Sequence, residues 1–254
     1  MINVVAMLFA VTLSLSDGSG LPSNCVGCSF AGRDLHGADL SGVSYVGADF
    51  ARADLRGASL RGANLAGANF SDADLRGADF RDARLAGVNL RGARIRGANF
   101  SGASLAGVDL RGVINDVSDA DARALLGRCA GCDLRDADIA GRDLSGISIA
   151  GGDLRRAKAR GVRLENADLE GVDFAEADLR NADLRNARLC SRDAHRYDFG
   201  DRIGCIDLRG ADVHGADFRG ALICTNGREP RTCQPVDAQT LRQYTKSTLD
   251  GATL

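Results

Sequence analysis

Residues 46–70 read VGADFARADLRGASLRGANLAGANF, in which a large apolar residue returns every five positions. From Phe30 to Leu110, sixteen of the seventeen residues at this spacing are Leu, Phe or Ile, and the exception is Tyr45. A small apolar residue, most often Ala, stands two positions before each, and Gly follows two positions after fourteen of them. A period of five fits neither the helical period of 3.6 nor the period of 2 of an unbroken strand, so it predicts a repeat architecture.

The five-residue unit has a simple physical interpretation. Residues two apart on an extended segment point to the same side, so the small and large apolar residues face inward and the polar residue between them faces outward. Gly then allows the positive φ of a tight type II turn. Four turns close a coil of 20 residues, which places Phe30, Phe50 and Phe70 above one another. Nine coils stacked about 4.8 Å apart predict a rod roughly 40 Å long.

Segments such as GADF at 47–50, GASL at 57–60 and GANF at 67–70 show the unit in its most regular form. In these motifs the chain resembles the pentapeptide repeat family, and the resemblance extends from Cys25 to Cys224. It implies an all-β fold, a right-handed quadrilateral (four-sided) parallel β-helix solenoid. Because proteins that share a fold perform many different functions, the resemblance predicts the architecture rather than the activity.

The repeats form two tandem arrays, residues 25–114 and residues 129–224. The connecting segment 115–128 lacks the pattern, and Ser118 is placed to cap a short helix over the sequence DADARALL. Whether the two arrays stack on one axis depends on this segment.

The second array begins as a copy of the first, which indicates an internal duplication. CVGC at 25–28 matches CAGC at 129–132, and AGRDL occurs at both 31–35 and 140–144. The pattern then predicts regular coil positions as far as Ala194 and Phe199, followed by a slip of one residue.

The two ends of the chain depart from the repeats. Residues 1–16 form an apolar run of signal-peptide length, residues 17–24 a polar linker, and residues 225–254 a C-terminal tail or cap. Within the tail, DAQTLRQYTKSTL is a candidate helix, and Leu249 and Leu254 leave a further half-repeat open. We expect an exported protein, periplasmic or secreted, and the sequence predicts no membrane span because it holds no apolar stretch of sufficient length.

Eight cysteines, even in number and paired as near neighbours, favour disulfides in an oxidising compartment. The expected disulfide cysteines are Cys25, Cys28, Cys129, Cys132, Cys190, Cys205, Cys224 and Cys233. Each C-x-x-C pair opens an array with both thiols toward the axis, which favours a structural closure of the coil end. A redox C-x-x-C site is the alternative. Zinc is the weaker interpretation, because the two pairs lie far apart and have no matching His.

The sequence predicts no catalytic, cofactor-binding or metal site. His36, His195 and His214 are scattered over different repeats, and no P-loop or dinucleotide motif occurs. Most Asp residues occupy the outward position. We expect a charged surface ladder formed by Asp54, Asp74, Arg56, Arg76 and Arg96.

We therefore predict a non-enzymatic structural or protein-interaction module whose partner is a protein or an envelope component. The resemblance implies an alternative, because some pentapeptide repeat proteins resemble duplex DNA, bind DNA gyrase and give quinolone protection. Such a mimic requires a dense negative surface, whereas residues 30–114 carry 9 Asp and 11 Arg. The net charge of −2 also argues against a nucleic-acid partner. A thiol redox role of the C-x-x-C pairs is the second alternative.

Overall fold

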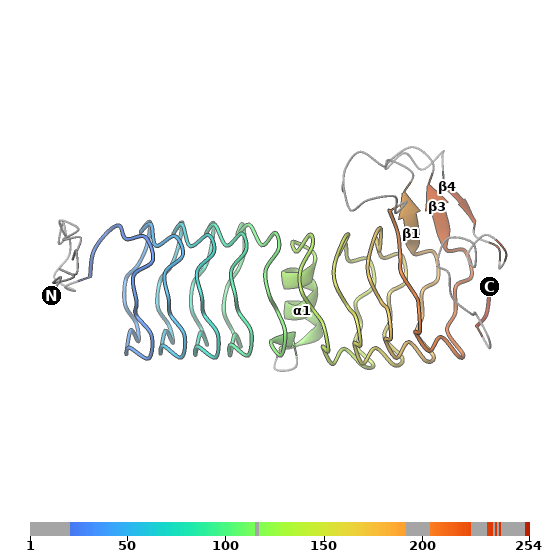
Figure 1. Ribbon diagram of the computed structural model, residues 1–254, viewed down its shortest axis with the longest axis horizontal. Coiled ribbons are helices and arrows are strands. Elements are labelled where there is room, and N and C mark those ends of the chain that lie inside the picture. Colours follow the sequence, from blue (N-terminus) through green and yellow to red (C-terminus); the bar gives the residue numbers. More distant parts are fainter. Residues whose placement is uncertain are drawn as a thin grey trace, which may run out of the picture.

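The chain forms a parallel β-solenoid in which residues twenty apart pair along a rod (Figure 1). The computed structural model describes residues 21–114, 117–191, 204–224, 233–235, 237, 239 and 252–254. Ser29 pairs with Asp49, and Asp49 with Asn69. The Phe30 N–H donates to the carbonyl of Asp49 at 2.7 Å, and the Asp49 N–H donates back to that of Cys28 at 2.8 Å. Such pairs of backbone hydrogen bonds, each spanning a few residues, connect neighbouring coils in place of long strands.

A turn follows each large apolar residue. The N–H of Arg33 donates to the carbonyl of Phe30 at 3.1 Å, and Gly32 between them has a φ of 65°. The left-handed conformation occurs also where Gly is replaced, with φ of 58° at Arg52 and 56° at Asp72. Six of the nine non-Gly residues with positive φ are Asp or Asn, the side chains that tolerate this region best after Gly.

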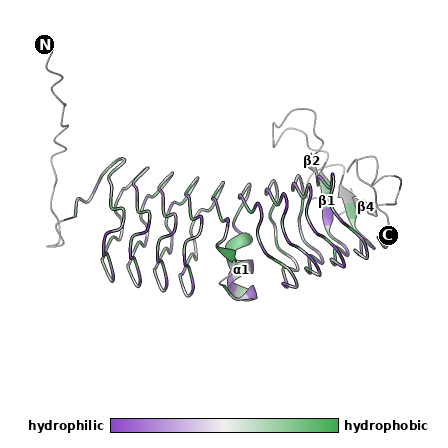
Figure 2. Ribbon diagram, turned by 60° about the horizontal axis from the view of Figure 1, so that its bottom comes forward, coloured by the Kyte–Doolittle hydropathy of each residue, from purple (hydrophilic) through white to green (hydrophobic). Residues whose placement is uncertain are grey.

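The core is a continuous column of stacked side chains. Phe50 and Phe70 are stacked with centroids 4.7 Å apart, and Phe80 and Phe100 with centroids 5.0 Å apart, as the twenty-residue spacing predicts. Ala fills the small inward positions, and Ala58 is fully buried. Apolar and polar residues therefore alternate along every coil (Figure 2).

One helix, α1 (Asp119–Leu126), interrupts the described coils near the middle of the rod (Figure 1). Ser118 is its N-cap, and the Ser118 side chain accepts from the N–H of Asp121 at 3.2 Å. Ala122, Leu125 and Leu126 are buried, so the helix covers the core where coil sides are missing.

The two arrays are joined across α1 by a continuous ladder. Asn89, Asp109, Asp133 and Asp153 pair in succession, and the N–H of Leu110 donates to the carbonyl of Asp133 at 2.9 Å. The structure thus stacks the second array directly on the first. The other three ladders of the first array end among the described residues at Arg94, Asn99 and Ser104.

A four-stranded sheet extends one side of the rod near its C-terminal end, in the order β2-β1-β3-β4. The strands are β1 (Arg188–Ser191), β2 (Gly204–Cys205), β3 (Leu222–Cys224) and β4 (Cys233–Pro235). Strand β1 is parallel to β3, and the two outer pairings are antiparallel.

The sequence predicted regular coil positions through Ala194 and Phe199, but the described pairing departs from the twenty-residue spacing after Leu189. Asp173 pairs with Asp207 instead of with a residue twenty positions on, and Ala194 and Phe199 themselves lie outside the described residues. The physical reason is the antiparallel pairing of β1 with β2, which places Cys205 beside Cys190, so the ladder resumes at Asp207.

The ends differ from expectation where they are described. Asn24 already pairs with Ser44, so the first coil begins inside the expected linker. At the other end Thr253 pairs with Asp217, which places a further half-repeat on the ladder. The expected signal peptide, residues 17–20 of the linker, most of the tail, and the candidate C-terminal helix apart from Asp237 and the helical Gln239 lie outside the described residues.

Candidate interaction surface

The outward Asp residues are held by the turn that follows them. Oδ1 of Asp54 accepts from the Arg56 N–H at 3.1 Å, and Oδ2 of Asp54 lies 2.6 Å from Nη2 of Arg56. Asp74 and Arg76 repeat this arrangement in the next coil, at 2.6 Å. The hydrogen bond from the Arg56 side chain lowers the pKa of Asp54 to about 2. The expected ladder residues Asp54, Arg56, Asp74 and Arg76 are thus brought together.

A second ladder crosses the junction between the arrays. Arg111 lies 2.5 Å from Asp109 of its own coil and 3.4 Å from Asp133 of the next, measured from side-chain nitrogen to carboxylate oxygen. Arg135 repeats this with Asp133 at 2.5 Å and with Asp153 at 3.5 Å. The hydrogen bond to Asp133 raises the pKa of Arg135. Opposite charges thus alternate along the rod, and each charge is neutralised by its neighbours.

One stretch of the second array is wholly acidic. Residues 164–179 hold six carboxylates and no basic residue. Arginines of neighbouring coils neutralise them: Glu165 pairs with Arg185 at 3.3 Å, Glu170 with Arg188, and Asp173 with Arg155 at 3.7 Å. Asp168 and Asp178 are also paired, and Glu176 alone of the six makes no salt bridge to a described residue.

One stretch of the first array is wholly basic, and only one of its four arginines is paired with a described carboxylate. Residues 83–108 hold no acidic residue and four arginines, which we call the basic band: Arg84, Arg91, Arg94 and Arg96. All four are exposed. Arg94 lies 3.8 Å from Asp74, whereas the other three make no salt bridge to any described residue. Arg96, expected in the surface ladder, belongs to this band.

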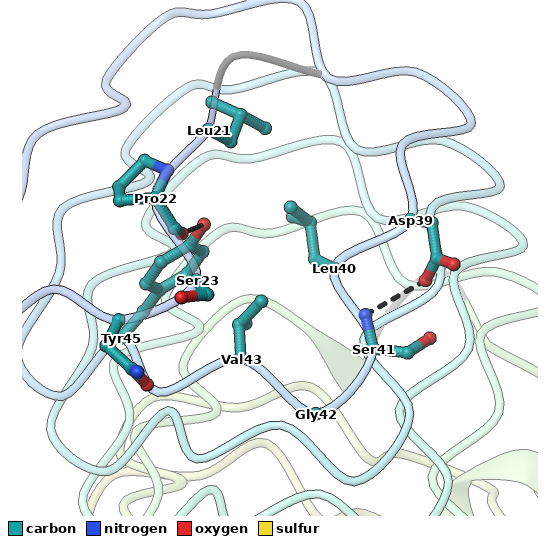
Figure 3. A pocket seen from close by; sticks show the side chains of 10 residues that line it. Leu21, Pro22, Ser23, Asp39, Leu40, Ser41, Gly42, Val43 and Tyr45 are labelled. Atoms are coloured by element: carbon teal, nitrogen blue, oxygen red, sulfur yellow. Dashed lines mark hydrogen bonds between the residues drawn. The ribbon is translucent and has the colours of Figure 1, made fainter. Parts of the chain in front are cut away.

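A small pocket and two histidines are further candidates for a binding or catalytic site among the described residues. The pocket in Figure 3 has a volume of about 190 Å³, lies at the N-terminal end and is lined by residues that include Asp39, Ser41 and Tyr45. It is smaller than the few hundred Å³ that ligand pockets commonly enclose. His36 and His214 are exposed, and His195 lies outside the described residues. Within the described ranges, no group of three His, Cys, Asp or Glu residues could hold a metal ion.

The C-x-x-C pairs are internal disulfides in the structure. Cys25 is joined to Cys28 with a Cα–Cα distance of 5.8 Å, and Cys129 to Cys132 with 5.5 Å. Cys190 is also disulfide-bonded. The backbone pairs Cys190 with Cys205 and Cys224 with Cys233 across neighbouring strands. The side chains of the last three cysteines lie outside the described residues.

The sequence already contained the signal for the basic band. A running count of charge shows no acidic residue between Asp82 and Asp109. Whether such a stretch stays unpaired depends on the coils above and below it, and only the structure distinguishes it from the neutralised acidic stretch.

No described helix has the length and apolar character to span a bilayer.

The chain is similar in sequence to pentapeptide repeat proteins. The family model for pentapeptide repeats matches residues 46–82, 73–112 and 153–190, with 8 copies of the repeat. Among curated proteins, none matches the chain.

Three solved structures illustrate the likeness. HetL, a pentapeptide repeat protein involved in heterocyst differentiation regulation from the cyanobacterium Nostoc sp. strain PCC 7120, is 27% identical over 78% of this chain and 81% of its own, with a TM-score of 0.43. AT2G44920, from the Arabidopsis thaliana thylakoid lumen, is 36% identical over 44% and 78%, with a TM-score of 0.26. QnrB1, a plasmid-mediated fluoroquinolone resistance protein, is 23% identical over 76% and 88%, with a TM-score of 0.25.

Proposed function

Because this chain belongs to the pentapeptide repeat family, we propose that it is an exported, non-enzymatic interaction module that binds an acidic partner protein through the basic band. The proposal takes the rod to be a right-handed, four-sided solenoid of two tandem arrays. The observation that carries it is the unpaired state of Arg84, Arg91 and Arg96 in a chain whose other charges largely neutralise one another.

The energetics of the band favour an external partner. A charge that is already paired gains little from a new carboxylate, because its existing hydrogen bonds must be given up. An unpaired arginine can form a bidentate contact with an incoming carboxylate. The arginines of the band lie on three consecutive sides of one coil, with the apolar residues Leu85, Leu90 and Ile95 buried behind them. The rod therefore presents them from a rigid support.

Two further features support the proposal. The axis of the rod is filled by buried side chains, which leaves little space for a reacting substrate. Export is supported by the apolar segment 1–16 and by the disulfides, which persist in oxidising compartments.

Binding can be tested with two triple variants of equal charge. One reverses the three unpaired arginines of the band (Arg84→Glu, Arg91→Glu, Arg96→Glu). The control reverses three exposed arginines elsewhere that also make no described salt bridge (Arg33→Glu, Arg52→Glu, Arg160→Glu). Each immobilised protein is exposed to an envelope extract, and the retained proteins are quantified by mass spectrometry over a range of salt concentrations.

We expect wild type and control to retain the same acidic proteins and the band variant to lose them. Retention should weaken with salt, because the Debye length falls from about 10 Å at 0.1 M to about 3 Å at 1 M. Equal retention by all three proteins would contradict the assignment of the band. Inhibition of gyrase supercoiling by wild type would favour the DNA-mimic alternative instead.

The location of the protein is tested separately, by its intact mass after cell fractionation with thiols blocked. A chain shortened near residue 16, outside the cytoplasm and with its cysteines oxidised, is the expected result. A full-length cytoplasmic chain with eight free thiols would refute export.

A further inference from the structure

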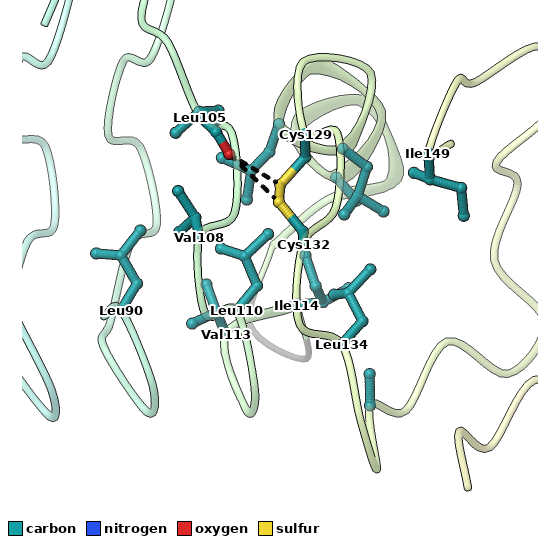
Figure 4. Close-up of a cluster of buried hydrophobic side chains, with 14 of the residues drawn as sticks. Leu90, Leu105, Val108, Leu110, Val113, Ile114, Cys129, Cys132, Leu134 and Ile149 are labelled. Carbon is teal, nitrogen blue, oxygen red and sulfur yellow. Dashed lines mark hydrogen bonds between the residues drawn. A yellow bond between two sulfur atoms is a disulfide. The ribbon is translucent and has the colours of Figure 1, made fainter. Parts of the chain in front are cut away.

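The duplicated C-x-x-C motifs have the same spacing but different surroundings. In the second pair Cys129 is 1% exposed and Cys132 is fully buried. Their Sγ atoms lie 3.6 and 3.4 Å from the carbonyl oxygen of Leu105 in the preceding coil (Figure 4). Coils on both sides therefore enclose this disulfide.

The first pair occupies the same register at the N-terminal end of the described rod. Cys25 is 8% exposed and Cys28 is only partly buried. Between them, the side chain of Val26 is 83% exposed, one of two large apolar side chains described as exposed. A protein that approached this end would meet an apolar contact beside a partly exposed sulfur.

We propose that Cys25–Cys28 is a thiol–disulfide exchange site for an external dithiol, whereas Cys129–Cys132 is purely structural. Exchange requires a thiolate to reach a sulfur along the disulfide axis, so access decides which disulfide reacts in the folded protein. The first site combines access with an apolar docking residue, and the second has neither.

The chemistry balances with a dithiol of the C-x-x-C type as the reductant. Its thiolate attacks Sγ of Cys28, which forms a mixed disulfide and releases the Cys25 thiolate, and this thiolate takes up a proton. The second thiol of the reductant, as its thiolate, attacks the mixed disulfide and releases Cys28. The reductant ends as a disulfide, and Cys25 and Cys28 end as two thiols.

The test measures both disulfides in the same molecule, with dithiothreitol as the probe. Native protein is incubated with the probe for increasing times, new thiols are alkylated with one reagent, and the remaining disulfides are reduced and alkylated with a second. Trypsin separates the sites, since it releases CAGCDLR at 129–135 and a separate peptide that ends at Arg33. Circular dichroism checks that the chain stays folded.

We expect Cys25–Cys28 to be reduced at least tenfold faster in the native protein, without loss of the circular dichroism signal. In 6 M guanidinium the two rates should converge, because unfolding removes the difference in burial and in contacts with other coils. Equal native rates, or faster reduction of Cys129–Cys132, would overturn the proposal. A rate difference that persists in guanidinium would also overturn it, because local sequence rather than access would then be the cause. The readout is independent of the basic band and of export.

Discussion

Arg142 forms hydrogen bonds to the residues around the junction between the arrays, and its substitution tests how much these bonds stabilise the rod. Nη1 donates to the carbonyl of Val117 at 2.9 Å and to Oδ1 of Asp119 at 3.1 Å, and Nη2 donates to the carbonyl of Ile114 at 2.7 Å. The side chain of Arg142 is 15% exposed. The duplicated AGRDL motif supplies a matched control in Arg33, which is exposed.

The expected cost of Arg142→Ala follows from these three bonds. Hydrogen bonds that involve a charged group contribute about 1.5–3 kcal/mol each, and neighbouring bonds are not additive. The substitution also leaves the carbonyls of Ile114 and Val117 without this donor in a buried setting. We expect a loss of about 2–4 kcal/mol, against about 0.5 kcal/mol or less for Arg33→Ala. Arg142→Lys should fall between them, because Lys keeps the charge but not the fork of donors.

The assay is urea unfolding followed by far-ultraviolet circular dichroism, because the chain has no Trp to serve as a fluorescence probe. Repeat proteins can unfold in parts, so amide hydrogen exchange across α1 is measured in parallel. Arg142→Ala should lower the unfolding midpoint and speed exchange in α1, and Arg33→Ala should change neither. Equal effects of the two Ala variants would refute the reasoning, since the motif alone would then decide the stability.

Three further predictions follow from the turns and ladders. Asp133→Asn should lower the free energy of unfolding by about 1 kcal/mol and Asp138→Asn by much less, because Asp133 is paired with two arginines and Asp138 forms no salt bridge to a described residue. Urea unfolding measures both losses, and equal losses would contradict the ladder. The hydrogen bond from Arg56 holds the pKa of Asp54 at about 2, so the stability that this bond contributes is present above pH 4 and lost as the pH falls toward 2. In Arg56→Gln, carbon NMR should find the Asp54 pKa nearer its ordinary value. An unchanged Asp54 pKa would exclude Arg56 as the cause. Gly87→Ala and Gly92→Ala both place Ala at positive φ, at a cost of about 1–2 kcal/mol. The new Cβ at position 92 would also clash with Oδ1 of Asp72, which should add about 1 kcal/mol to the loss measured by thermal unfolding. That increment should vanish in an Asp72→Gly background, and its persistence there would show that Asp72 is not its source.

The sequence alone determined the local rules of this fold, because each rule depends on residues within one or two coils. The five-residue spacing predicted the inward column, the stacking of Phe50 on Phe70 and the turns at glycines such as Gly32. Ser118 before DADARALL likewise predicted a cap for the helix that the structure contains. The same spacing also predicted an unbroken twenty-residue register beyond Leu189, whereas Asp173 pairs with Asp207.

Only the tertiary structure decided what lies above and below each residue. Arg142 and Arg33 share a motif, yet Arg142 donates to three oxygens of residues 114–119 and Arg33 is exposed. The acidic stretch 164–179 and the basic band each carry charges of one sign in sequence, yet arginines pair with five of the six carboxylates whereas a described carboxylate pairs with only one of the four arginines. The reason is that contacts between coils join residues about twenty positions apart within an array and more across insertions. Partnership, burial and accessibility therefore depend on which coil lies on either side of a residue, and across insertions such as 115–128 the five-residue spacing does not specify this.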